Sequence, residues 1–144
     1  MNAPLQIAMP PEASAKPKTY RLLIGGKHVD ARDGRELERR SPGHGFVVSR
    51  YAQAGEADVE AAAQAAHEAF EKGPWPRMKG SERASVLLRT ADLIEARAEE
   101  IARLDALESG KPIAQARGEI AGSVDIWRYA AALARTLSGE SYAN

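Results

Sequence analysis

The spacing of apolar residues along the chain changes near residue 55. In residues 20–51, apolar residues form short runs separated by turn-forming residues, as in β-strands. From residue 55 onwards they recur every three or four positions, which is the period of an α-helix. The pattern predicts a small β unit followed by three or four helices.

The β unit is predicted from three short segments. Residues 20–29 hold two apolar runs on either side of Gly25 and Gly26, and paired glycines between such runs indicate a tight hairpin. Strands are also predicted at residues 36–40 and 46–51, because the residues between them are rich in turn formers. We expect a small antiparallel unit with too few strands to be stable alone.

The first predicted helix begins after Gly55 and ends at the Gly-Pro-Trp-Pro segment, residues 73–76, because proline cannot continue a helix. Its apolar face is formed by four residues spaced three or four apart: Val59, Ala63, Ala66 and Phe70. His67 falls on the opposite, polar face. We therefore expect His67 to be a solvated helix residue and not a ligand or a base.

The next helical run starts near Ser81 and forms either one bent helix or two. Its apolar residues alternate at spacings of four and three: Leu87, Ala91, Ile94, Ala98, Ile101 and Leu104. Gly110 stands where a left-handed capping residue is needed, and Pro112 follows two places later. The run is therefore predicted to end at Gly110.

The last run, residues 113–137, is apolar around most of its circumference. One stripe comprises Ile120, Val124, Trp127, Ala131 and Ala134. A second stripe comprises Ile126, Ala130, Leu133 and Leu137. A helix of this kind is normally buried in a larger body, and the alanine-rich helices before it cannot cover both stripes. We therefore expect the sequence to be part of a protein and not the whole.

Composition narrows the function classes. The chain has 20 Lys and Arg against 20 Asp and Glu, so its balanced charge gives no reason to expect nucleic-acid or membrane partners. It has no Cys, which excludes thiolate nucleophiles and disulfides, and its three His are too scattered for a zinc cluster. Residues 1–18, with four prolines and no aromatic residue before Tyr20, are predicted to be a disordered leader. No signal or transmembrane segment is evident, and we expect a cytoplasmic protein.

No local motif indicates an active site. Gly110 and Lys111 do not form a phosphate loop, because Asp105 and Pro112 occupy the positions that need Gly and Ser or Thr. Gly43 and Gly45 lie between two predicted strands, whereas a dinucleotide loop joins a strand to a helix. The serines lack any elbow motif. From the residues alone, the chain is a mostly helical piece without an active site of its own.

An ordered series of short motifs over residues 20–142 resembles the N-terminal part of the aldehyde dehydrogenase superfamily. In the β unit, residues 23–29 resemble the family's first hairpin, and residues 41–45 stand in place of its Asn-Pro-Ala-Thr-Gly turn. In the helical part, the matching residues are Gly73-Pro74-Trp75 followed by Glu82-Arg83, then residues 87–89 and 91–95. Glu108-Ser109-Gly110-Lys111-Pro112 follows, and then Arg128-Tyr129-Ala130 with Gly139-Glu140. Each motif alone is weak, and their shared order and spacing make chance agreement improbable.

The resemblance implies an α/β parent enzyme, usually a dimer or tetramer, that oxidises an aldehyde to a carboxylate with NAD or NADP through a cysteine thiohemiacetal. It implies that residues 19–144 are an incomplete part of the cofactor-binding half, mostly helical with a small antiparallel β unit. In the family the nucleophilic Cys and the cofactor site lie further along the chain than this sequence extends. We therefore expect these 144 residues alone to be inactive and to bind no cofactor.

Two site positions are carried over by the resemblance. In many relatives a monovalent cation is held by backbone carbonyls, at positions that correspond to Arg39 and Arg40, and by an acid, at the position of Glu108. A substrate-channel position falls near Gly122, and the absence of an acid there argues against a cationic aminoaldehyde substrate. The alternative hypothesis is a stand-alone helical interaction module that binds a partner through Ile126, Ala130, Leu133 and Leu137.

Overall fold

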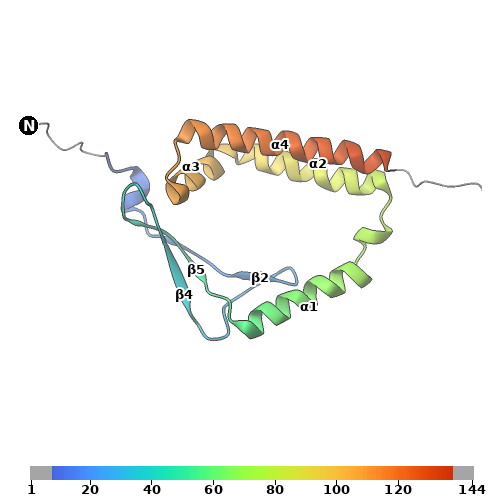
Figure 1. Ribbon diagram of the computed structural model, residues 1–144, viewed down its shortest axis with the longest axis horizontal. Coiled ribbons are helices and arrows are strands. Elements are labelled where there is room, and N and C mark those ends of the chain that lie inside the picture. The colour runs from blue at the N-terminus through green and yellow to red at the C-terminus, as the bar shows by residue number, and fades with distance from the viewer. Residues whose placement is uncertain (1–7, 138–144) are drawn as a thin grey trace, which may run out of the picture. The chain divides into compact units, whose positions relative to one another are not determined.

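The computed structural model describes residues 8–137, and it contains five strands and four α-helices within that range (Figure 1). In chain order the elements are a 3-10 turn η1 (Pro11–Ser14), β1 (Lys18–Tyr20), β2 (Leu22–Ile24), β3 (Lys27–Val29), β4 (Glu36–Arg40), β5 (Val47–Ala52), α1 (Glu56–Lys72), η2 (Trp75–Arg77), α2 (Gly80–Ala96), α3 (Ala98–Ser109) and α4 (Ile113–Thr136). Two compact units are present. The first comprises residues 8–68 and 104–111, and the second comprises residues 69–103 and 112–137.

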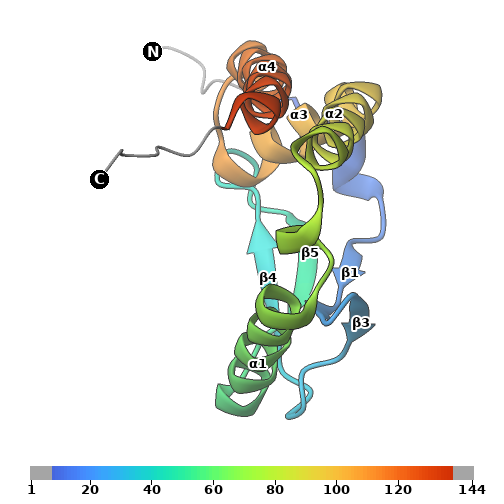
Figure 2. The same ribbon diagram turned by 90° about the vertical axis from the view of Figure 1, so that its right-hand side faces the viewer.

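The sheet of the first unit is mixed. Its strand order is β1-β5-β4, with β1 parallel to β5 and β4 antiparallel to β5 (Figure 2). The expectation of a purely antiparallel unit was therefore wrong, because β1 pairs with β5 in the parallel direction. The sequence pattern did not identify β1, because its three residues Lys-Thr-Tyr carry no apolar alternation and their pairing partner lies about thirty positions away. The strands predicted at residues 36–40 and 46–51 are confirmed, the second with its bounds shifted to Val47–Ala52.

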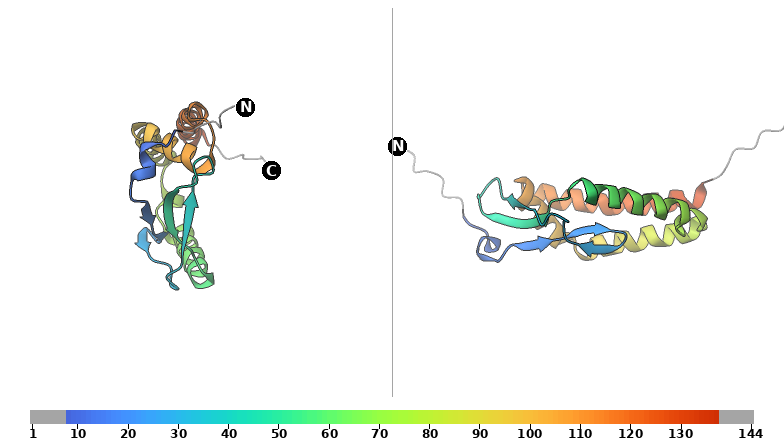
Figure 3. Two further views of the ribbon diagram at one scale, coloured as in Figure 1. Left: turned by 90° about the vertical axis from the view of Figure 1, so that its left-hand side faces the viewer. Right: turned by 90° about the horizontal axis from the view of Figure 1, so that it is seen from below.

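The predicted hairpin is confirmed as a separate two-stranded sheet of β2 and β3, which the view from below shows clearly (Figure 3). Gly25 and Gly26 form its turn with φ of 57° and 76°, a backbone conformation that is easily adopted only by glycine. An added Cβ at Gly25 would lie 3.8 Å from the Ala65 Cβ of α1, so the turn lies against that helix.

The N-terminal segment differs in part from the disordered leader predicted at residues 1–18. Residues 1–7 lie outside the described residues, but Pro11–Ser14 form the turn η1 and Lys18 begins β1, pairing with Ser49. Prolines favour the start of such a turn because they fix φ near its helical value. The assignment of residues 19–144 to one incomplete domain stays a prediction.

Helix α1 begins with a capping interaction centred on Asp58. This side chain is buried, and its Oδ2 accepts hydrogen bonds from the backbone N–H of Gly55 at 3.0 Å and of Arg32 at 3.3 Å. The apolar face predicted for this helix is exposed, with Val59 59% and Phe70 72% accessible. His67 is exposed, as expected for a solvated helix residue.

The second unit is built on the antiparallel packing of α2 against α4, which run side by side in two perpendicular views (Figures 1 and 2). Small residues allow this close approach: Ala84 and Ala91 on α2, and Ala116 and Ala131 on α4, are buried. At one end, a Cβ on Gly80 would lie 2.3 Å from the Ala134 carbonyl oxygen, so the backbones themselves are close.

The helix boundaries follow the sequence closely. The run that starts near Ser81 is two helices, which Arg97 separates with φ of −115° and ψ of 16°. Helix α4 covers Ile113–Thr136, and its first stripe packs inward with Val124 and Ala131 buried. No helix within residues 8–137 is long and apolar enough to cross a membrane. The turn expected at Gly139 and Glu140 lies outside the described residues.

Candidate functional site

A small polar cluster in the first unit joins the sheet to the C-terminal end of α3. Ser49 of β5 is 1% exposed, and its hydroxyl donates a hydrogen bond of 2.7 Å to the Glu108 Oε1. The Arg39 guanidinium, from the paired position on β4, donates to the backbone carbonyl oxygen of the same Glu108. Glu108 is therefore held at both its side chain and its backbone.

The turn between β4 and β5 packs against the end of the same helix. The Ser41 carbonyl oxygen accepts a 2.7 Å hydrogen bond from the Gly45 N–H, and the Ser41 hydroxyl lies 3.0 Å from the His44 Nδ1. Pro42 lies so close to Gly110 that a Cβ added to this glycine would be 2.8 Å from the proline Cγ. Gly110 has φ of 78°, which confirms the left-handed cap predicted there.

The predicted monovalent cation site uses the backbone carbonyls of Arg39 and Arg40 and the acid of Glu108, and the structure shows where the two arginine side chains lie. Arg39 and Glu108 are in contact, whereas the Arg40 side chain is directed to Glu38 Oε2 at 2.7 Å and to the Gly45 carbonyl at 3.3 Å. The cation site itself stays a prediction. Within residues 8–137, three or more His, Asp or Glu side chains are nowhere grouped so that they could hold a metal ion.

Sequence reasoning did not identify Ser49 as part of this cluster. Its partner Glu108 is 59 positions away, so no local motif links them. The available signal was a lone small polar residue in a strand whose other residues are mostly apolar or long. Such a residue on the inward face of a strand usually has a hydrogen-bond partner.

The second stripe of α4, predicted as a binding face, is largely exposed in the second unit. Ile126 is 68% accessible, Leu133 46% and Leu137 75%, while Ala130 is half-buried. Apolar surface of this extent on one helix marks a place where other protein or a ligand is expected.

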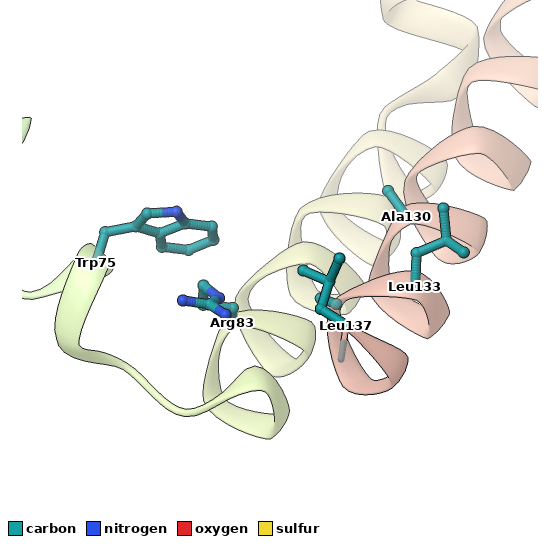
Figure 4. A pocket seen from close by; sticks show the side chains of 6 residues that line it. Trp75, Arg83, Ala130, Leu133 and Leu137 are labelled. Atoms are coloured by element: carbon teal, nitrogen blue, oxygen red, sulfur yellow. The ribbon is translucent and has the colours of Figure 1, made fainter. Parts of the chain in front are cut away.

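An open pocket of about 500 Å³ lies at the C-terminal end of this stripe (Figure 4). Its lining is Trp75, Arg83, Ala130, Leu133, Ala134 and Leu137. Figure 4 shows Trp75 and Arg83 on one side of the pocket and Ala130, Leu133 and Leu137 of α4 on the other. Sequence reasoning treated Trp75 and Arg83 only as motif residues, because they come from η2 and α2 and meet α4 only in the folded unit.

Gly122, the predicted substrate-channel position, is an exposed residue on α4. A Cβ added there would meet no atom within 4 Å, so the position accepts a larger side chain without a clash. Its role stays a prediction.

Comparison with known proteins gives a consistent result. The profile of the aldehyde dehydrogenase family matches residues 28–144. Aldehyde dehydrogenase family 2 member C4 of Arabidopsis thaliana is 39% identical over 125 residues, which make up 86% of this chain and 25% of the relative. The 2-hydroxymuconic semialdehyde dehydrogenase of a Pseudomonas species is 42% identical over 114 residues, 79% of this chain and 22% of the relative.

Solved structures agree with these sequence matches. The NAD-dependent aldehyde dehydrogenase from Sinorhizobium meliloti matches with a TM-score of 0.87 and 50% identity, covering 91% of this chain and 26% of that one. The NAD+ complex of an aldehyde dehydrogenase from Bacillus cereus gives 0.81 and 35% identity, covering 94% and 28%. The chain therefore spans about a quarter of the length of the proteins that it matches.

Proposed function

Since the chain belongs to the aldehyde dehydrogenase family, we propose that it is the N-terminal segment of an enzyme that oxidises an aldehyde to a carboxylate with NAD or NADP. The observation that carries this proposal is the agreement of fold and sequence over most of the chain with an NAD-dependent aldehyde dehydrogenase. The small-molecule aldehyde and a homo-oligomeric state are parts of the same proposal.

The reaction needs residues that this chain lacks. A thiolate has to attack the aldehyde carbon, and none of the 144 residues is a cysteine. The described residues also do not fit a nucleotide site. Gly43 and Gly45 lie in the turn between two strands, and no glycine-rich loop within residues 8–137 leads from a strand into a helix. We propose that the 144-residue chain is inactive alone and that the remaining part of the enzyme supplies the nucleophile and the cofactor site.

We propose that this segment contributes packing surface to the enzyme and no catalytic residue. The α2–α4 pair presents an apolar stripe, and the remaining part of an aldehyde dehydrogenase is the proposed partner for that stripe. A cytoplasmic location is proposed with it, although relatives include proteins described as mitochondrial, such as the benzaldehyde dehydrogenase of Antirrhinum majus.

The substrate proposal rests on Gly122. An acid on this face would favour a cationic aldehyde by charge attraction, and glycine supplies none. We therefore propose an uncharged or anionic aldehyde. In the complete enzyme, Gly122→Glu is expected to raise kcat/KM for a cationic aminoaldehyde relative to a neutral aldehyde of equal length. The neighbouring exposed Gly118, changed to Glu, is the control. Equal ratios for both variants and the parent would contradict a substrate-channel role for Gly122.

The activity itself is tested on the complete protein that contains this sequence. Purified protein is mixed with a panel of aldehydes and with NAD or NADP, and the formation of reduced cofactor is followed. We expect aldehyde-dependent reduction by the complete protein and none by residues 1–144 alone. A complete protein without this activity on any aldehyde would overturn the proposal, and so would activity of the short chain.

The exposure of Ile126, Leu133 and Leu137 also favours the second candidate, a helical module that binds a partner protein through this face. The two candidates differ in what covers the stripe. Serine substitutions at Ile126 and Leu133 would destabilise the complete enzyme if the stripe packs inside it. They would instead remove partner capture, without a loss of stability, if the chain acts as a separate module.

A further inference from the structure

The C-terminal end of α3 combines two sources of negative charge. The last carbonyl groups of a helix carry a partial negative charge and have no partner further along the helix. Glu108 adds a full negative charge in the last turn, where a carboxylate is unfavourable. A compensating positive charge at this point would stabilise the fold.

Nearby residues donate hydrogen bonds to several carbonyl groups at this helix end. The Gly110 N–H donates to the Ala106 carbonyl at 2.9 Å, and the Ser109 hydroxyl donates to the Asp105 carbonyl at 2.6 Å. The Lys111 ammonium lies 2.9 Å from the Asp105 Oδ2. The Glu108 carbonyl, in the last turn, accepts a hydrogen bond from the Arg39 guanidinium.

The side chain of Glu108 has its own partner. Ser49 donates to the Glu108 Oε1 from a buried position on β5, and this neutral donor does not compensate the carboxylate charge. Arg39 is paired with Ser49 across the two strands, next to the bulge between Arg39 and Arg40. The strand pairing therefore brings the Arg39 guanidinium to the backbone carbonyl of the residue whose side chain was predicted to hold a monovalent cation.

We propose that Arg39 is a built-in cation for the end of α3, so that its guanidinium takes the place of a bound sodium or potassium ion at Glu108. The Arg39 guanidinium donates to the Glu108 carbonyl, and an ion bound to the carboxylate of the same residue would be a second positive charge nearby. Repulsion between these like charges disfavours binding of the ion. The arginine is covalently attached and donates hydrogen bonds in a fixed geometry, so it requires no ion from solution.

The test is thermal melting of the complete protein at constant ionic strength in potassium, sodium or N-methylglucamine chloride. We expect the parent protein to melt at the same temperature in all three salts. Arg39→Met is expected to melt roughly 2–4 °C lower in N-methylglucamine and to recover part of this loss in potassium or sodium. Arg50→Met is the matched control, because Arg50 lies on the strand next to Ser49 but is paired with Glu38.

Two results would overturn the proposal. One is a melting temperature of the parent protein that rises saturably with potassium or sodium, which would show that an ion binds while Arg39 is present. The other is an Arg39→Met protein with the same salt response as Arg50→Met. If Arg39→Met does not fold, Arg39→Lys replaces it in the test. Arg39→Lys keeps the positive charge, so its melting temperature has to be the same in all three salts. Because melting needs no substrate, these results do not depend on the proposed enzymatic activity.

Discussion

Gly110 is the residue at which local backbone conformation and tertiary packing depend on each other most closely. Its φ of 78° belongs to the left-handed region, and Pro42 fills the space that a side chain would need. The residue ends α3 and also allows the β4–β5 turn to lie against that end. A substitution there therefore has two separable costs.

Gly110→Ala is expected to lower the free energy of unfolding by roughly 1–3 kcal/mol, through backbone strain and contact with Pro42. Gly26→Ala is the matched control, because Gly26 has φ of 76° and no atom within 4 Å of an added Cβ. Chemical denaturation of both variants measures the two costs. A loss no greater for Gly110 than for Gly26 would refute the packing contribution, and no loss at Gly110 would refute the cap.

The sequence predicted residues whose role depends on near neighbours. The Gly110 cap could be recognised because the cap, the lysine and the proline are consecutive in the chain. Ser49 could not, since its burial and its partner Glu108 are set by the meeting of β5 with a helix 59 positions later. Arg39 was assigned for its backbone carbonyl, and only the folded chain shows that its guanidinium contacts Glu108.

At the scale of elements, ion pairs reinforce the packing between helices of the second unit. Arg128 of α4 lies 2.7 Å from the Glu95 Oε2 of α2, and Arg117 of α4 lies 2.7 Å from the Glu99 Oε1 of α3. The hydrogen bond from Arg128, followed by its charge, lowers the pKa of Glu95, and the hydrogen bond from Arg117 lowers the pKa of Glu99. All four side chains are largely open to solvent, so each pair contributes little.

These pKa shifts predict acid sensitivity. A carboxylate whose pKa is lower in the folded state than in the unfolded state stabilises the fold above its unfolded value. That contribution is lost as the pH falls below about 4.5, the ordinary pKa of glutamate, through the folded value. Denaturation midpoints measured from neutral pH to about pH 3 should therefore fall less steeply for the Glu95→Gln, Glu99→Gln double variant than for the parent.

Glu38, whose pKa is also lowered by Arg50 and Arg40, belongs to the first unit and would still titrate in that variant. Some acid sensitivity therefore remains in the expected result. An unchanged slope in the double variant would contradict a role for the two ion pairs. High salt should reduce the difference between the variant and the parent, because exposed charges are screened.

Helices were more predictable than strand pairing for a physical reason. The helical period, Pro74, Pro76 and Gly110 are all local in sequence, and together they placed the helix ends within a few residues. The parallel pairing of β1 with β5 depends on contact between distant segments. The exposure of the apolar face of α1 was also not evident from periodicity, since the helix buries Asp58 while Val59 and Phe70 are exposed.

For the whole molecule, the main feature is apolar surface that the chain does not cover by itself. Ile126, Leu133 and Leu137 are exposed on α4, next to the open pocket that contains Arg83 and Trp75. The sequence predicted this excess, because alanine-rich helices cannot bury two stripes on one neighbour. It could not predict which part of the stripe forms the pocket, since Trp75 and Arg83 come from different elements.

We propose that the chain is one segment of a longer aldehyde dehydrogenase. The most direct test is the intact mass of the polypeptide that carries this sequence in its native source, measured by mass spectrometry after capture with an antibody against α4. The cited relative is about three and a half times as long as this chain, since 125 residues make up 25% of it, so we predict a mass several-fold above 15.5 kDa. A mass of 15.5 kDa would contradict the claim.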